Sequence, residues 1–82
     1  MSNFNKECKL SELKVGQEGI VVKINIKDKV IKRHLLDMGI TRGVKIKIKK
    51  IAPMGDPIDI ALRDYELCIR KNDLDKINVE VI

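Results

Sequence analysis

The sequence predicts a mainly β fold, a small five-stranded barrel with one short α-helix between the first and second strands. Short segments alternate apolar and polar residues, which is typical of strands with one buried face. Glycine and proline separate these segments where the chain must turn. Phe4 and Tyr65 are the only aromatic residues, so the core must be built from Ile, Val and Leu side chains, which pack well on a pleated sheet.

Residues 19–26 predict the first strand. They alternate so that one face carries four branched apolar side chains, and we expect this face to point into the core: Ile20, Val22, Ile24 and Ile26. Upstream of this strand, Leu10 and Leu13 are expected to seal one end of the core.

The helix follows this strand. Asp28 is suited to cap its first turn, because a carboxylate oxygen accepts hydrogen bonds from free backbone N–H groups there. Ile31, Leu35 and Met38 then share one apolar stripe. Gly39 is expected to end the helix in a left-handed conformation, which lets Ile40 fold back onto Leu35.

The second strand is predicted over residues 44–51. Its apolar residues alternate with lysines until Lys50 and Ile51 break the alternation, which indicates a bulge. The loop that follows contains Pro53, Gly55 and Pro57, and Pro57 suits only the unpaired start of the next strand.

The remaining strands are predicted over residues 58–62, 65–69 and 77–81. Arg63 and Asp64 form a tight reversal between the first two of these, and a short helical turn over residues 72–75 precedes the last. Short strands in this order, with one helix, fit a small SH3-like barrel.

Composition limits the classes of function. A chain of 82 residues forms one domain with little room for a catalytic cleft. Its net charge of +5 raises the question of an anionic partner. Two cysteines and an N-terminus without an apolar signal-like run favour a reducing cytoplasm. No apolar run reaches the roughly 20 residues that span a bilayer, so we expect no direct membrane insertion.

The residue patterns point away from an enzyme. The glycines match neither a P-loop nor a dinucleotide-binding fingerprint, and His34 is the only histidine. Cys8, His34 and Cys68 are metal-ligand types, but they lie far apart and lack the paired spacing of soft-ligand sites. We therefore expect no catalytic residues, no cofactor and no metal site.

Residues 35–77 resemble the FeoA family. The resemblance rests on Leu35-Leu36-Asp37-Met38-Gly39-Ile40, then Gly43, then Ala52-Pro53-Met54-Gly55-Asp56-Pro57, then Arg63, Tyr65, Leu67 and Arg70, and it extends over residues 10–81. It implies one FeoA-like, SH3-like domain over residues 1–82, with residues 1–9 flexible. It also implies a non-enzymatic, cytoplasmic, bacterial accessory of ferrous iron transport and iron homeostasis.

The resemblance further implies a partner, a FeoB-type ferrous iron transporter whose cytoplasmic GTPase-bearing domain binds this chain and whose transport it modulates. The matching positions imply a docking surface made of two groups of residues: Leu35, Leu36, Met38 and Gly39 on the helix, and Pro53, Met54, Gly55 and Asp56 in the loop. Leu36 cannot share the narrow stripe of Ile31 and Met38, so it either widens the buried arc or is exposed as an anchor. A weak homo-oligomer is a further expectation, since exposed strand edges tend to self-associate.

The competing hypothesis is an RNA-binding barrel. Residues 15–23 resemble the KOW motif, and Lys45, Lys47 and Lys49 on one strand face could neutralise phosphates. Single-stranded nucleic acid is usually bound with stacked aromatics, however, and neither aromatic residue is expected on that face. Alternating lysines also protect an edge strand from pairing. A nucleic-acid partner is therefore not our first expectation.

Overall fold

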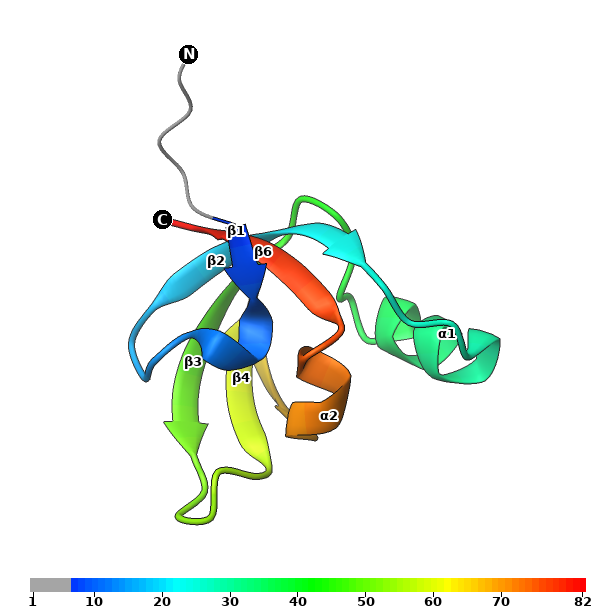
Figure 1. Ribbon diagram of the computed structural model, residues 1–82. Coiled ribbons are helices and arrows are strands. Elements are labelled where there is room, and N and C mark those ends of the chain that lie inside the picture. Colours follow the sequence, from blue (N-terminus) through cyan, green and yellow to red (C-terminus); the bar gives the residue numbers. More distant parts are fainter. Residues whose placement is uncertain (1–6) are drawn as a thin grey trace.

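The computed structural model describes residues 7–82, which form a curved, six-stranded antiparallel sheet with helices at its margins (Figure 1). The strands lie in the order β1-β6-β2-β3-β4-β5. In chain order the elements are β1 (Glu7–Lys9), the 3₁₀-helix η1 (Leu10–Glu12), β2 (Glu18–Ile24), α1 (Lys29–Asp37), β3 (Lys45–Ile51), β4 (Ile58–Leu62), β5 (Tyr65–Ile69), α2 (Lys71–Leu74) and β6 (Ile77–Val81).

The mainly β fold is confirmed, but the sheet has one strand more than the five predicted. The additional strand is β1, which pairs with β6 so that Cys8 lies opposite Val79. Glu7–Lys9, which we expected to be flexible, thus form a paired strand in which Cys8 packs against the core. Residues 1–6, including Phe4, lie outside the described residues.

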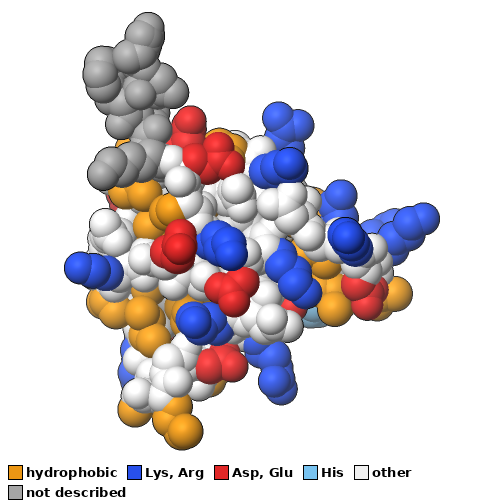
Figure 2. All heavy atoms as spheres, in the orientation of Figure 1, with side chains coloured by type: hydrophobic (Ala, Val, Ile, Leu, Met, Phe, Trp, Pro, Cys, Tyr) orange, Lys and Arg blue, Asp and Glu red, His pale blue; other side chains and the backbone are white. Residues whose placement is uncertain are grey.

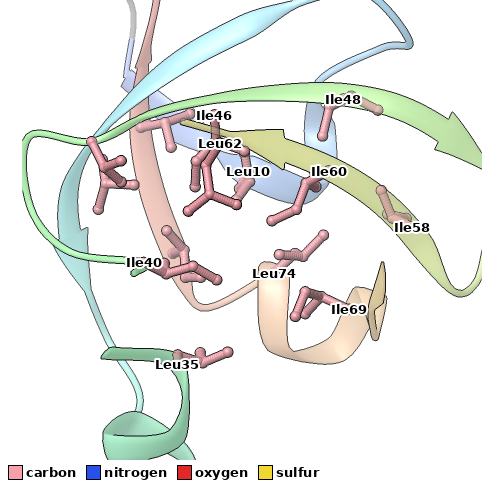
Figure 3. Packing of buried hydrophobic residues seen from close by; sticks show 14 of the residues in the cluster. Leu10, Leu35, Ile40, Ile46, Ile48, Ile58, Ile60, Leu62, Ile69 and Leu74 are labelled. Atoms are coloured by element: carbon pink, nitrogen blue, oxygen red, sulfur yellow. The ribbon is translucent and has the colours of Figure 1, made fainter. Parts of the chain in front are cut away.

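The core is aliphatic, as predicted. Figure 3 shows side chains from β3, β4, β5, η1 and α2 pointing toward one another inside the curved sheet. Every buried side chain among the described residues is apolar. Leu10 and Leu13 are buried at one end of this core.

The first part of strand β2 faces the core with the opposite set of residues from the one predicted. Val21 is 1% exposed, whereas Ile20 and Val22 are half-buried on the other side. The reason is Gly19, where an added Cβ would lie 2.7 Å from Cγ2 of Val79, so that β6 packs directly against the β2 backbone. A register shift between Val21 and Lys23 then returns the strand to the predicted orientation, so that Ile24 lies opposite Ile77 and packs against the core and Ile26 is buried.

Both ends of α1 form as predicted. The Asp28 carboxylate accepts hydrogen bonds from the N–H groups of Val30, at 2.9 Å, and Ile31, at 3.3 Å. Gly39 has a φ of +96°, and the Ile40 N–H donates to the Leu35 carbonyl at 3.0 Å. This is the hydrogen bond of a Schellman stop. Figure 1 shows α1 projecting from one side of the sheet.

The bulge predicted near Lys50 is confirmed by a register shift between Ile48 and Lys50 in the β3–β4 pairing. The β4–β5 hairpin turns tightly at Arg63 and Asp64, and Arg63 has the positive φ, of 54°. The helical turn expected over residues 72–75 is α2, one residue earlier. No helix within residues 7–82 is long and apolar enough to cross a membrane.

Replacing Gly39 tests the junction between α1 and the sheet. A left-handed conformation costs an alanine about 1–2 kcal/mol, and a Cβ at Gly39 would in addition collide with the Tyr65 hydroxyl. Gly43 has a φ of +89° but nothing within 4 Å of an added Cβ, so Gly43→Ala is a matched control. We expect Gly39→Ala to lower the free energy of unfolding in urea more than Gly43→Ala does. Equal losses of free energy of unfolding in the two variants would show that the contact with Tyr65 does not affect stability.

Replacing Asp28 tests the start of α1. Asp28→Ala removes the capping oxygen and should lower the free energy of unfolding by about 1 kcal/mol. Asp28→Asn keeps a capping oxygen and should retain most of that stability in the same urea titration. If the Asn variant loses as much free energy of unfolding as the Ala variant, the stabilisation comes from the negative charge near the helix N-terminus and not from the capping hydrogen bond.

Candidate docking surface

The two groups of predicted docking residues lie in different parts of the molecule. The helix group surrounds the C-terminal end of α1, at one side of the sheet, whereas the loop group joins β3 to β4 at the lower end of Figure 1. They therefore do not form one continuous surface, and each must be considered by itself.

In the helix group, Leu36 alone presents a large side chain to solvent, with 37% of its surface exposed. Leu35, which the resemblance placed in the docking surface, is 1% exposed and is the residue that holds α1 to the core. Met38 and Gly39 are half-buried. The Met38 carbonyl accepts a hydrogen bond from the Tyr65 hydroxyl, which ties the end of α1 to β5.

In the loop group, Pro53 and Met54 are exposed at the tip, and Met54 is 95% exposed. Gly55 has a φ of +87°, and its N–H donates to the Ala52 carbonyl at 2.7 Å to close the turn. Figure 2 shows hydrophobic side chains at this lower tip. Asp56 is exposed, and its carboxylate also has a structural role, because it accepts a hydrogen bond from the Lys71 N–H, at 2.8 Å, at the start of α2.

Leu36 belongs to a groove of about 620 Å³ between α1, β2 and the segment after α1, which we call the α1–β2 groove. Its lining combines apolar side chains with basic ones: Val22, Lys23, Ile24, Lys32, Leu36, Thr41 and Arg42. No carboxylate lines it. The surface around Leu36 is thus an apolar floor with a basic rim.

Our sequence interpretation missed the contribution of β2 to this groove because it assigned Val22 to the core, and because Ile24, which does pack against the core, also lines the groove. Gly19 was the available signal. A glycine inside a strand often marks a close approach or a bulge, and here it marks the close approach of Val79 from β6.

On the other side of α1, a second groove of about 330 Å³ brings His34 and Cys68 onto one lining, together with Asp73. Cys8 lies elsewhere, opposite Val79 in the β1–β6 pair. A hydrogen bond with Asp59 raises the pKa of the Cys68 thiol, and burial raises that of Cys8, so both thiols are held in the protonated form. Within residues 7–82, no three His, Cys, Asp or Glu side chains are grouped so as to hold a metal ion.

The lysines of β3 lie on the exposed face, as expected, but acidic residues stand beside them. Lys47 is directly opposite Glu18 on β2, and Lys50 is opposite Asp59 on β4. Figure 2 shows Lys and Arg side chains interspersed with Asp and Glu on the visible face. Opposite charges at paired positions weaken the field that an anion would experience there.

Similar known proteins identify the family of this chain. The model of the FeoA domain family matches residues 8–81. The chain is 34% identical over 74 residues to an Fe(2+) transport protein A/Fe(2+) transporter FeoB fusion protein of Porphyromonas gingivalis; this match covers 90% of the chain but only 9% of the length of that relative.

Solved structures show the same fold. The FeoA-like protein from Clostridium acetobutylicum is 39% identical, with a TM-score of 0.84 over 96% of this chain and 91% of that one. A FeoA from Stenotrophomonas maltophilia, a prokaryotic SH3 domain protein solved with zinc, has a TM-score of 0.72 over 87% of each chain. At 22% identity this second likeness concerns the fold alone, and it confirms the predicted SH3-like class. Together with the family match and the fusion relative, these likenesses show that the chain belongs to the FeoA family.

Proposed function

We propose that this chain is a non-enzymatic cytoplasmic accessory of ferrous iron uptake that binds the GTPase-bearing region of a FeoB-type transporter and modulates transport. The observation that supports this most strongly is the relative in which transport protein A and the transporter FeoB form one polypeptide. Fusion places the two partners at a high effective concentration, which favours a contact that separate chains must make by diffusion.

The exposed apolar side chains around α1 and the β3–β4 loop suit a protein partner. Val30 is 78% exposed and Met54 is 95% exposed, and both stand on elements that project from the sheet. Projecting apolar side chains of this kind act as anchors in protein contacts, and a methionine adapts its shape to the surface that it meets. We place the primary contact at α1, because Leu36 lies in a formed groove there.

Leu36→Glu tests this contact. Leu36 is partly exposed, so we expect the variant to fold, with its free energy of unfolding within about 1 kcal/mol of the parent chain. Its affinity for the purified GTPase-bearing region of the cognate FeoB should fall about tenfold or more, since a charge would enter an apolar contact. Val15→Glu is the matched control, because Val15 is an exposed valine (58%) in the turn before β2, outside the lining of both grooves beside α1.

The measurement is a titration of ¹⁵N-labelled chain with the GTPase-bearing region, with a short single-stranded RNA at the same ionic strength as comparator. Shifts near Leu36 that the Val15→Glu variant retains and the Leu36→Glu variant loses would support the proposal. Salt-sensitive shifts on Lys45, Lys47 and Lys49 with RNA, and none with the GTPase-bearing region, would replace it with the RNA-binding alternative.

A further inference from the structure

We infer that the α1–β2 groove binds an extended acidic peptide segment, whose apolar side chain enters the groove and whose backbone pairs with Ile24. The inference deepens the proposed function and rests on it in one respect, that the segment belongs to the transporter. It names the chemistry of that segment, which the family match and the fusion relative leave open.

The first argument is the shape and polarity of the groove. Val22 and Ile24 from β2 and Leu36 from α1 present apolar surface to a hollow of about 620 Å³. That volume exceeds what one aliphatic side chain fills, so a partner can insert a side chain and keep its backbone at the rim. Val22 and Ile24 are half-buried, so an inserted side chain would remove more of their surface from water.

The second argument is charge. Lys23, Lys32 and Arg42 line the same groove, all three are exposed, and no carboxylate lines it with them. The ion pair nearest in sequence, between Arg33 and Asp37 at 3.8 Å, engages two residues outside the lining. Three cations around an apolar floor are complementary to a segment in which acidic residues flank an apolar one.

The third argument is the free edge of β2. The last hydrogen bonds between β2 and the chain leading into β3 are made by Val21, which donates to the Val44 carbonyl at 3.0 Å and accepts from the Gly43 N–H at 2.7 Å. Beyond Val21, β2 pairs on its other side with β6. In the described part of the chain, no strand covers the remaining edge of Val22–Ile24.

The direction of the backbone groups identifies which residue of that edge is available. The Asn25 N–H donates to the Lys76 carbonyl at 2.7 Å, so Asn25 faces the β6 side. Because successive residues of a strand direct their N–H and C=O groups to opposite edges, those of Ile24 face the α1–β2 groove. One residue of an extended peptide can therefore form a pair of backbone hydrogen bonds with Ile24 while its neighbours place side chains over the floor and the rim.

The probe is a synthetic peptide, acetyl-Asp-Glu-Val-Leu-Val-Glu-Asp-amide, titrated into the ¹⁵N-labelled chain at low salt. We expect shifts at Val22–Ile24, Leu36 and Arg42 that weaken as salt is raised. A peptide with lysine in place of its acidic residues should not bind, and N-methylation of the central leucine of the probe should weaken binding several-fold. Absence of shifts in the groove, or equal binding of the lysine peptide, would overturn the inference. So would shifts in the groove that depend on the concentration of the chain without peptide, because the occupant would then be a second copy.

Charge reversal on the rim supplies the matched variants. Lys32→Glu with Arg42→Glu should lower the affinity for the acidic peptide by about tenfold or more, whereas Lys47→Glu with Arg63→Glu, an equal change of charge on the other side of β3, should change it by about twofold or less. Equal losses in both variants would overturn the inference, since net charge alone would explain them.

The same two variants, titrated with the GTPase-bearing region of the cognate FeoB, separate this inference from the proposed function. Binding lost only in the Lys32→Glu, Arg42→Glu variant supports both. If both variants bind the GTPase-bearing region equally well, the proposed function is retained and the proposed role of the groove is overturned. If the unmodified chain does not bind the GTPase-bearing region, the proposed function is overturned. The preference of the groove for acidic peptides is then tested by the peptide titration alone.

Discussion

The close packing of β6 against β2 at Gly19 determines which side chains of β2 belong to the core and which to the surface. A side chain on residue 19 would collide with Val79. The inward-facing space beside Val21 is therefore filled by a residue of the neighbouring strand, β6. Ile20 and Val22 consequently lie on the opposite side, where they are half-buried, and a register shift after Val21 returns Ile24 to the side that packs against the core. Val22 therefore contributes to the apolar floor of the α1–β2 groove and not to the core.

Helix α1 supplies the opposite wall of that groove because it is fastened at its ends and at one buried residue. Asp28 caps its start, and the Gly39 stop with the Tyr65 hydroxyl on the Met38 carbonyl ties its end to β5. Leu35 alone among its residues is fully buried. A helix held in this way keeps a defined position while most of its surface, including Leu36, stays open to a partner. Leu35 therefore contributes to stability, and we propose that the adjacent residue, Leu36, contributes to recognition.

Much of the fold could be predicted from the sequence where the pattern was local. The alternation in β3 and β4, the Asp28 cap and the Gly39 stop each involve residues within one or two turns of the chain, and each is confirmed. Contacts between distant residues were not predictable in this way. Pairing of three-residue β1 with β6, capping of α2 by Asp56 and the parity of β2 depend on partners far along the chain. Of the candidate site, Leu36 was named but its groove was not, because the groove needs β2 and α1 placed together.

The distribution of the charges over the surface, more than the net charge, determines which kinds of anion this surface can bind. On β3, Lys47 and Lys50 stand at paired positions opposite Glu18 and Asp59, so the positive charge of the lysine face is partly neutralised. The rim of the α1–β2 groove has three cations and no carboxylate in its lining. A phosphate backbone would use that rim but gain nothing from the apolar floor beneath it. An acidic peptide with an apolar side chain uses both, which supports the proposal that the net positive charge of the chain serves protein recognition.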